Sequence, residues 1–349
     1  MDTHNTMPYI TAYLPGIGGK IKTKPSHFVV REIPLYEPSG DGEHVYVSLT
    51  RSGWTTQSLR KELAGLFDIK EVNVGYAGMK DKQACVTQIF SLHLHKATEP
   101  DVMAKIEDSL PVKINWAKRH QNKLRVGHLI GNRFEIVVAD PVAGAQELSE
   151  NISSVLSKHG VPNFYGVQRF GIHGDNARRG RDVLLGNGRC KHWLRNLLIS
   201  AFTSALFNQW LICRIERGWF DTLLVGDMAK KADTGGLFEV TDLQQDMERF
   251  RQQQIGYTGP IYGSKMRWAL AEAGELEKTV LDQSGVTIDM FRKHKAQGSR
   301  RTAQVFLNDL SIQPHPDGLQ FMFTLPKGAY ATTVMREFMK TEPALPSNN

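Results

Sequence analysis

Residues 75–87 read Gly75-Tyr-Ala-Gly-Met-Lys-Asp-Lys-Gln-Ala-Cys-Val-Thr87. The two glycines allow a tight turn or a close backbone approach, and apolar residues alternate again from Phe90 to Leu94. This pattern predicts a strand, a tight loop and a second strand, with Asp81 at the loop tip above a sheet. Lys80 and Lys82 flank the aspartate, favour its ionised form and attract phosphate. The loop is therefore a candidate nucleophile site, and a solvated turn is the structural alternative.

The size and composition of the chain indicate a globular protein with more than one core. Its 349 residues exceed the usual size of a single core, so we expect two domains, or one domain with a large insertion. No run reaches the roughly 18 uncharged apolar residues that a membrane span requires. Residues 1–8 lack the basic start and apolar run of a secretory signal, so we expect a cytoplasmic protein that does not bind a membrane.

The charges and the cysteines indicate which partners and cofactors the chain is expected to bind. The chain has 43 Lys and Arg against 36 Asp and Glu, and the net charge of +7 fits a polyanionic partner. Cys85, Cys190 and Cys213 are odd in number and widely spaced, so we expect reduced thiols. The sequence contains neither a metal-ligand cluster nor a glycine-rich dinucleotide loop, and we expect no metal and no organic cofactor.

Basic segments concentrate the positive charge. Residues 118–125 carry four Lys or Arg and no acid, which suits phosphate binding, and a solvated edge strand is the structural alternative. Residues 169–195 carry seven Lys or Arg and two acids, and residues 290–301 carry five and no acid. This pattern favours a nucleic acid as the partner.

Periodicity separates two kinds of structure along the chain. Apolar residues alternate, as in half-buried strands, over residues 45–49, 112–116, 134–138 and 319–325. They recur at helical spacing over residues 59–67, 146–158, 193–217, 243–250 and 270–281, and a further helix is expected from Tyr330. The expected fold class is α/β in the mixed α+β sense, with a helix-rich middle third. The segment after Glu342 has the composition of a short disordered tail.

Five segments in sequence order carry a more specific signal. The longest, Asn163-Phe-Tyr-Gly166-Val-Gln168-Arg169-Phe170-Gly171, has the form Asn-x-x-Gly-x-Gln-Arg-Phe-Gly. It matches at every fixed position a motif of the TruD family of tRNA pseudouridine synthases, which the chain resembles over nearly its whole length. The other four segments that resemble motifs of this family are Lys22 to Glu32, Gly78-x-Lys80-Asp81-Lys82-x-Ala84, Gly131-Asn132-x-Phe134, and Leu325-Pro-x-Gly328 with Arg336-Glu337.

Three positions depart from the family pattern. Val86 stands where a threonine is usual, Ser26-His27 replace an acidic pair, and Tyr330 stands where phenylalanine is frequent. The Tyr330 ring retains the ability to stack on a nucleotide, and its hydroxyl adds a polar group.

The resemblance implies roles for individual residues. It implies that Asp81 is the catalytic nucleophile and that Lys22 is the cation paired with it. Asn132 is implied to contact the target nucleotide and Phe134 to stack on its base, while Phe28 and Tyr330 shape the pocket. From the pattern alone, Phe28 and Phe134 are also typical of a sheet core. The residues implied as RNA contacts or supports are Lys80, Gln168, Arg169 and Arg336, and a structural hinge is the alternative for Gln168 and Arg169.

The resemblance also implies a domain plan and an activity. A pseudouridine-synthase catalytic domain with a mixed or antiparallel sheet is expected at residues 1–159 and 305–349, interrupted by a helix-rich TRUD domain at 160–304. The implied reaction is isomerisation of uridine to pseudouridine, at position 13 of tRNA and especially of tRNA-Glu, by a monomer without a cofactor. A non-catalytic RNA-binding or RNA-chaperone protein is the alternative. An RNA methyltransferase is disfavoured, because no convincing methyl-donor loop is present.

Overall fold

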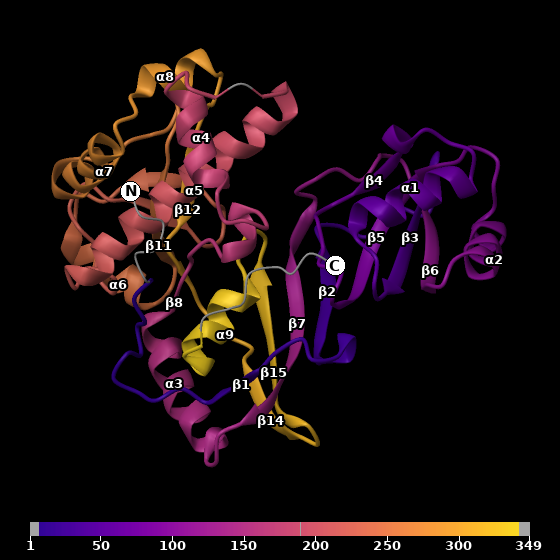
Figure 1. Ribbon diagram of the computed structural model, residues 1–349, viewed down its shortest axis with the longest axis horizontal. Helices are drawn as coiled ribbons and strands as arrows, with labels where there is room; N and C mark the ends of the chain where they lie inside the picture. The colour runs from indigo at the N-terminus through magenta and orange to yellow at the C-terminus, as the bar shows by residue number, and fades with distance from the viewer. Residues whose placement is uncertain (1–6, 189, 342–349) are drawn as a thin grey trace. The chain divides into compact units, whose positions relative to one another are not determined.

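The computed structural model describes residues 7–188 and 190–341, which form two compact units (Figure 1). The sheet unit comprises residues 17–150 and 307–328. The helical unit comprises the described residues of 1–16, 151–306 and 329–349. These units are defined by contacts within the chain, and they do not test the domains that the resemblance implies. The expected domain boundaries at 159/160 and 304/305 therefore stay predictions. The expected tail after Glu342 lies outside the described residues.

One mixed sheet organises the sheet unit. Its strands lie in the spatial order β14, β15, β7, β2, β5, β3 and β6, while β1 pairs with β7 and β4 with β5. The strand bounds are β1 (Gly18–Lys20), β2 (Phe28–Pro34), β3 (His44–Arg51), β4 (Val74–Tyr76), β5 (Cys85–His93), β6 (Lys113–His120), β7 (Leu129–Pro141), β14 (Ser311–His315) and β15 (Gly318–Pro326). The neighbours β2 and β5 are parallel, and the other described pairs of this sheet are antiparallel. The predicted mixed sheet, and the strand, loop and strand around Asp81, are confirmed.

Two helices cover one face of this sheet beside β3 and β5. The alternating side chains Val45, Val47 and Leu49 of β3 are fully buried against helices α1 (Thr56–Leu66) and α2 (Glu99–Ser109). Burying each such side chain contributes roughly 1.5–3 kcal/mol. The Thr55 hydroxyl accepts a hydrogen bond from the Ser58 amide at 2.9 Å and so caps the start of α1.

Helix α5 (His192–Glu216) is the central helix of the helical unit, and its bounds confirm the predicted helix at 193–217. Among the described residues it alone is long and apolar enough to cross a membrane, but 67% of its apolar window is buried in the unit. Phe207, Trp210 and Leu211 lie in the largest apolar cluster of the unit. Helix α5 therefore has the burial of a core helix.

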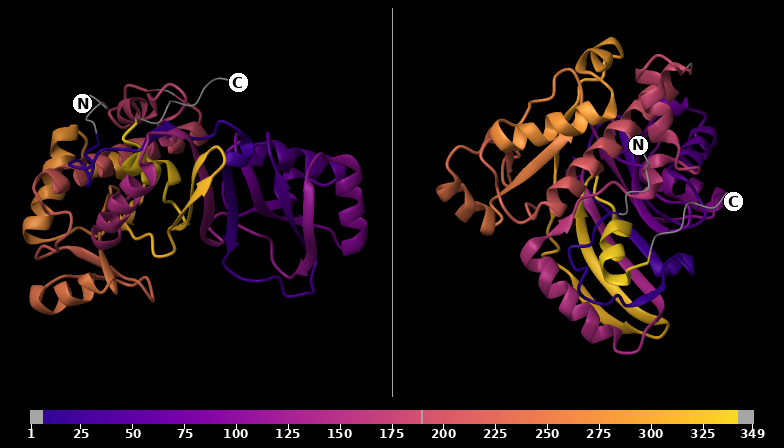
Figure 2. Two further views of the ribbon diagram at one scale, coloured as in Figure 1. Left: turned by 90° about the horizontal axis from the view of Figure 1, so that it is seen from below. Right: turned by 60° about the vertical axis from the view of Figure 1, so that its left-hand side comes forward.

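The apolar cluster around α5 (Figures 1 and 2) receives side chains from helices α4 (Asn176–Leu184), α6 (Leu243–Arg251), α7 (Ala271–Ser284) and α8 (Ile288–Lys293) and from strands β9 (Met228–Lys231) and β11 (Ile255–Ile261). The unit also contains α9 (Ala331–Met339), and α3 (Ala145–His159) contains the boundary between the units. A small sheet has the order β10 (Leu237–Glu239), β9, β11 and β12 (Ser299–Thr302), and β8 (Val161–Pro162) pairs with β13 (Gln304–Val305). A Cβ at Gly259 of β11 would lie 2.3 Å from the Trp210 ring, so this close contact with α5 requires glycine.

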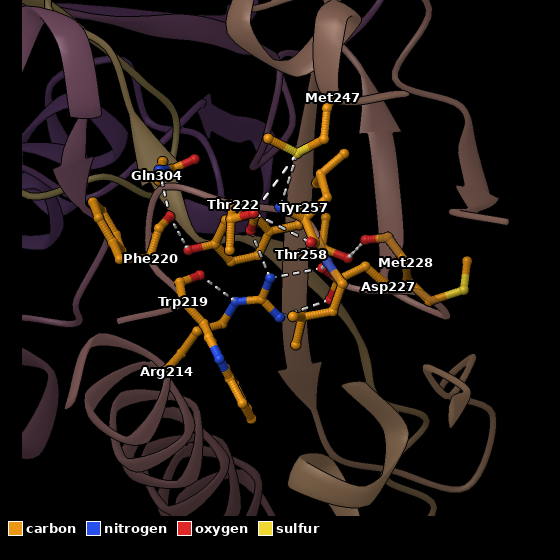
Figure 3. Close-up of polar contacts among 12 residues, drawn as sticks. Arg214, Trp219, Phe220, Thr222, Asp227, Met228, Met247, Tyr257, Thr258 and Gln304 are labelled. Atoms are coloured by element: carbon orange, nitrogen blue, oxygen red, sulfur yellow. Dashed lines mark hydrogen bonds and ion pairs between the residues drawn. The ribbon is translucent and has the colours of Figure 1, made fainter. Parts of the chain in front are cut away.

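A buried ion pair connects α5 to the segment that follows it (Figure 3). Arg214 donates to both carboxylate oxygens of Asp227, at 2.8 and 2.6 Å, and both side chains are almost completely buried. The same guanidinium donates to the carbonyls of Trp219 and Thr222 and lies 3.9 Å from the centre of the Tyr257 ring. Most donors of the arginine are thus satisfied, as a charge in an apolar core requires.

Asp227→Asn should destabilise the protein by about 3–5 kcal/mol, because it leaves the Arg214 charge buried without its carboxylate. Urea unfolding of the full chain measures this change. The control Asp282→Asn alters an exposed aspartate of α7 and should change the free energy of unfolding by less than about 0.5 kcal/mol. Equal stability of the two variants would contradict a stabilising role of the pair.

Candidate active site

The loop that carries Asp81 lies between β4 and β5 of the sheet unit. Neither Gly75 nor Gly78 has a positive φ. Of the two expected uses of glycine, the close backbone approach fits Gly75, because a Cβ there would lie 2.3 Å from the Leu124 carbonyl oxygen. The Asp81 side chain is 28% exposed, and its Oδ1 accepts a hydrogen bond from the Gln83 amide at 3.1 Å. The carboxylate is thus oriented by the loop and reachable from solvent.

Lys22 brings its ammonium to this carboxylate from a segment far away in the sequence. Its Nζ donates to Asp81 Oδ2 and lies 4.6 Å from the centre of the Phe28 ring. The lysine side chain is 14% exposed, so water screens this ion pair less than a surface pair. The structure therefore brings together Lys22, Asp81 and Phe28, as the resemblance implies.

A row of aromatic side chains lies across β2, β7 and β15. Phe134 is 6.2 Å from Phe28 and 5.7 Å from Phe323, measured between ring centres. Phe28 and Phe134 are 4% and 7% exposed, so both have the burial of the sheet-core alternative. Because Lys22 lies over Phe28, this core also forms an apolar wall beside the ion pair.

Asn132 of β7 lies on the strand that carries Phe134 and faces Leu325 and Glu32 on the neighbouring strands. Its side-chain oxygen is buried and has no hydrogen-bond partner among the described residues. A buried acceptor without a partner is costly, so a ligand that donates to it would be stabilised.

A buried polar network holds the loop on both sides of Asp81. The Lys80 ammonium pairs with Glu32 of β2, and these side chains are 5% and 1% exposed. The Lys80 amide donates to the Thr56 hydroxyl at 2.9 Å, and Gln88 donates to the Gly78 carbonyl at 2.6 Å. The ammonium of Lys80 is therefore engaged inside the protein and supports the loop.

Arg51 completes this network from β3. It donates to Gln88 Oε1 at 3.0 Å and to the Thr56 hydroxyl at 3.2 Å. Burial lowers the pKa of Arg51 to about 10, against the opposing attraction of Glu32, so the guanidinium stays charged at neutral pH. Neither Arg51 nor a site role for Glu32 is predictable from the sequence, because a charged residue on a strand is normally solvated.

The other four expected site residues lie in the helical unit. Tyr330, just before α9, is half-buried with its ring 6.0 Å from the Tyr165 ring. Arg169 donates to the Ser204 hydroxyl at 3.0 Å, and Gln168 is exposed on the short helix η3 (Val167–Phe170). Arg336 is 4% exposed, donates to the Met7 carbonyl and stacks on Tyr9 at 3.8 Å. Arg336 therefore has the environment of a supporting residue.

The longest motif is held by an arginine that the sequence analysis did not select. Arg301 of β12 donates to the Asn163 side-chain oxygen at 2.6 Å and to its carbonyl at 3.1 Å. Its guanidinium lies 4.0 Å from the centre of the Tyr165 ring, and burial lowers its pKa. Arg301 thus holds Asn163 and Tyr165 against β12.

The three cysteines are free, as the sequence predicts. The basic run at 118–125 is partly used inside the protein, because Arg119 donates to the carbonyls of Gly42 and Leu94 and Lys123 donates to that of Val72. These two side chains bind backbone oxygens of the protein. Neither phosphate binding nor a solvated edge strand would require these contacts.

Comparisons with known proteins identify the chain as a member of the pseudouridine synthase class. The family model described as tRNA pseudouridine synthase D (TruD) matches residues 4–189 and 177–338. The chain therefore belongs to the TruD family.

Relatives and a solved structure agree with this membership. The chain is 40% identical to tRNA pseudouridine synthase D of Thermus thermophilus over 96% of its own length and 92% of the relative. It is also 40% identical to the protein of that name from Anaeromyxobacter dehalogenans, over 98% and 99% of the two chains. The crystal structure of the putative tRNA pseudouridine synthase D of Methanosarcina mazei has the same fold, with a TM-score of 0.77, 22% identity and 96% coverage of both chains.

We predict that Glu32→Leu is several kcal/mol less stable than wild type, because Lys80 then lacks its buried partner. The double variant Glu32→Leu with Lys80→Met should recover much of the loss, since no charge remains buried. Thermal unfolding and urea titration measure both. Lys24→Met, which breaks the exposed Lys24–Asp317 pair, serves as the control and should cost less than about 1 kcal/mol. Additive losses in the double variant would show that the pair does not act as a unit.

Proposed function

We propose that the protein isomerises uridine to pseudouridine in tRNA, with Asp81 as the nucleophile and without a cofactor. The observation that carries the proposal is the Asp81–Lys22 ion pair on a loop that matches the family motif. Membership in the TruD family supports the reaction class. The individual roles rest on the geometry of the sheet unit and on the resemblance.

The reaction moves the base from an N1 to a C5 glycosidic bond, and substrate and product have the same oxidation state. A carboxylate assists it by attacking C1′ of the ribose, by adding to C6 of the base, or by helping to form a glycal. Each route needs an ionised carboxylate that reaches the nucleotide. Lys22 stabilises the charge of Asp81, while the partial exposure of Asp81 leaves its carboxylate accessible.

Asn132 is the group that we propose recognises the base. Its buried side-chain oxygen is an acceptor, and the N3–H of uracil is a donor on the Watson-Crick edge. Binding would satisfy both groups at once. Phe28 and Phe134 are proposed to shape the apolar wall of the nucleotide pocket, and Phe134 is proposed to stack on the base.

The residues of the helical unit are proposed to bind the rest of the tRNA. Tyr330 combines a half-buried ring with a hydroxyl whose pKa burial raises, so it remains a neutral donor for a nucleotide. Exposed Gln168 is proposed as an RNA contact, and Arg169 and Arg336 as supports. Extruding the target uridine from its stack costs a few kcal/mol, which contacts of cationic side chains with phosphates help to offset.

The substrate that we propose is uridine 13 of tRNA, especially of tRNA-Glu. This specificity follows the resemblance to compact bacterial members of the family. We also propose that the protein acts in the cytoplasm and as a monomer.

Asp81→Asn should lower the rate of pseudouridine formation on the order of 10⁴-fold, because asparagine keeps the volume but lacks the nucleophilic charge. The test incubates each protein with unmodified cellular tRNA without a cofactor and maps pseudouridine by carbodiimide-dependent primer extension. Binding of tRNA, measured by filter retention, should be preserved. Asp68→Asn, an exposed aspartate after α1, is the matched control with wild-type activity expected.

Each outcome of that experiment distinguishes the proposed enzyme from an alternative. A wild-type stop at position 13 that disappears in Asp81→Asn supports both the reaction and the nucleophile. Persistent modification by Asp81→Asn would refute its role. A wild-type protein that binds tRNA without modifying it would favour the non-catalytic RNA-binding protein.

Lys22→Met should reduce the single-turnover rate by about 10²–10³-fold, since it removes the cation that stabilises the charge of Asp81. The affinity for tRNA should change much less than the rate, because the ion pair is directed at one carboxylate. Lys24→Met removes a nearby exposed lysine and should leave the rate unchanged. Equal losses of affinity in the two variants, with no loss of rate, would show that Lys22 only attracts RNA.

A further inference from the structure

A cluster of imidazoles and one carboxylate lies at one end of β3 and β5 in the sheet unit. His93 is the last residue of β5, His95 follows two residues later, and Glu43 directly precedes β3. The antiparallel register pairs His44 with His93, which places Glu43 beside the segment between the two histidines. The ligand-type atoms of Glu43, His93 and His95 all lie within 4.8 Å of one another.

The distances in this cluster match the spacing between the ligands of a metal ion. The two carboxylate oxygens of Glu43 lie 3.3 Å from His93 Nε2 and 3.4 Å from His95 Nδ1. Hydrogen bonds of this kind are usually about 2.7–2.9 Å long. Ligands of a tetrahedral zinc ion at about 2.0–2.1 Å from the metal lie about 3.3 Å from each other. The carboxylate already stands at that spacing from both rings.

The backbone beneath the cluster is held in place. The Leu94 amide donates to the Glu43 carbonyl at 3.0 Å. Arg119 of β6 donates to the carbonyls of Gly42 and Leu94, both at 2.9 Å, and also to that of Ala97. These bonds join the two segments that carry the three side chains, so an ion would find the ligands nearly positioned.

A third imidazole, that of His44, packs against His93. The His44 ring stacks on His93 at 4.7 Å between ring centres. This contact packs the His93 ring from the side of β3.

We propose that Glu43, His93 and His95 bind one divalent transition-metal ion of the zinc type. Two imidazoles and a carboxylate are a ligand set that such ions prefer, and water would complete the coordination. The side chains of Glu43 and His95 are 64% and 57% exposed, so the ion would exchange with solvent. The bound ion would join the start of β3 to the end of β5.

This site is independent of the proposed isomerisation. Asp81 precedes the other end of β5, whose nine residues place the two ends about 26 Å apart. The ion would stabilise the folded sheet unit and would not take part in the chemistry at Asp81. The sequence predicted that the chain binds no metal, and our proposal departs from that prediction at this end of the sheet.

The test is calorimetric titration of the untagged full-length protein with zinc sulfate, accompanied by the absorption spectrum of the cobalt(II) form. We expect one equivalent of zinc to bind and the thermal unfolding midpoint to rise with zinc concentration. His95→Gln and Glu43→Gln, both at exposed positions, should fold normally and weaken zinc binding at least tenfold. The matched control His159→Gln alters a histidine that faces a single carboxylate, Asp221 at 3.2 Å, and should bind zinc like wild type.

Three results would overturn the proposal. The first is a wild-type protein that binds no zinc, and the second is equal zinc affinity in wild type, His95→Gln and Glu43→Gln. The third is loss of binding in His159→Gln but not in the other two variants. Asp81→Asn should bind zinc with wild-type affinity, so failure of the proposed catalysis and failure of the metal site are observed separately.

Discussion

The parallel pairing of β2 with β5 is the constraint on which the candidate active site depends. The register aligns Val29 with Cys85, so both strands begin at the same edge of the sheet. Lys22 lies in the segment before β2, and Asp81 lies in the loop before β5. Parallel strands bring the residues that precede them to one edge, which is why two distant segments form an ion pair. If β2 and β5 were antiparallel, Lys22 and Asp81 would lie at opposite ends of the sheet.

Buried ion pairs recur in both units of this structure. The pair of Glu32 and Lys80 supports the loop of Asp81, and the pair of Arg214 and Asp227 joins α5 to the segment that follows it. A third buried pair is formed by Arg300 and Glu277. Buried pairs contribute little net stability compared with apolar packing, but an unpaired partner is strongly unfavourable. They therefore penalise alternative arrangements of the segments that they join. In the sheet unit this penalty acts on the loop that orients the proposed nucleophile.

Some of the site follows from residue patterns, and some does not. The loop of Asp81 is predictable because two glycines interrupt alternation and one acid stands between two lysines. The pairing of Lys22 with Asp81 came from resemblance, since no local pattern connects residues 59 apart. The support from Glu32 and Arg51 was not predictable, because a charge on a strand normally faces water. The cluster of Glu43, His93 and His95 was not predicted for a related reason. Its side chains come from the ends of two strands that are distant in the sequence.

The sequence by itself determined the local elements and the family. Helical periodicity defined α5, alternation defined β3 and β15, and the ungapped motif at 163–171 identified the TruD family. Only the tertiary structure decided that Phe28 and Phe134 are buried in one aromatic row and that Lys80 and Arg336 are engaged inside the protein. It also decided that the Asn132 side-chain oxygen has no hydrogen-bond partner in the part of the chain that the structure describes. The physical reason is that periodicity and turn propensity are properties of neighbouring residues. Strand register, burial and the pairing of charges are decided by segments that meet only after the chain has folded.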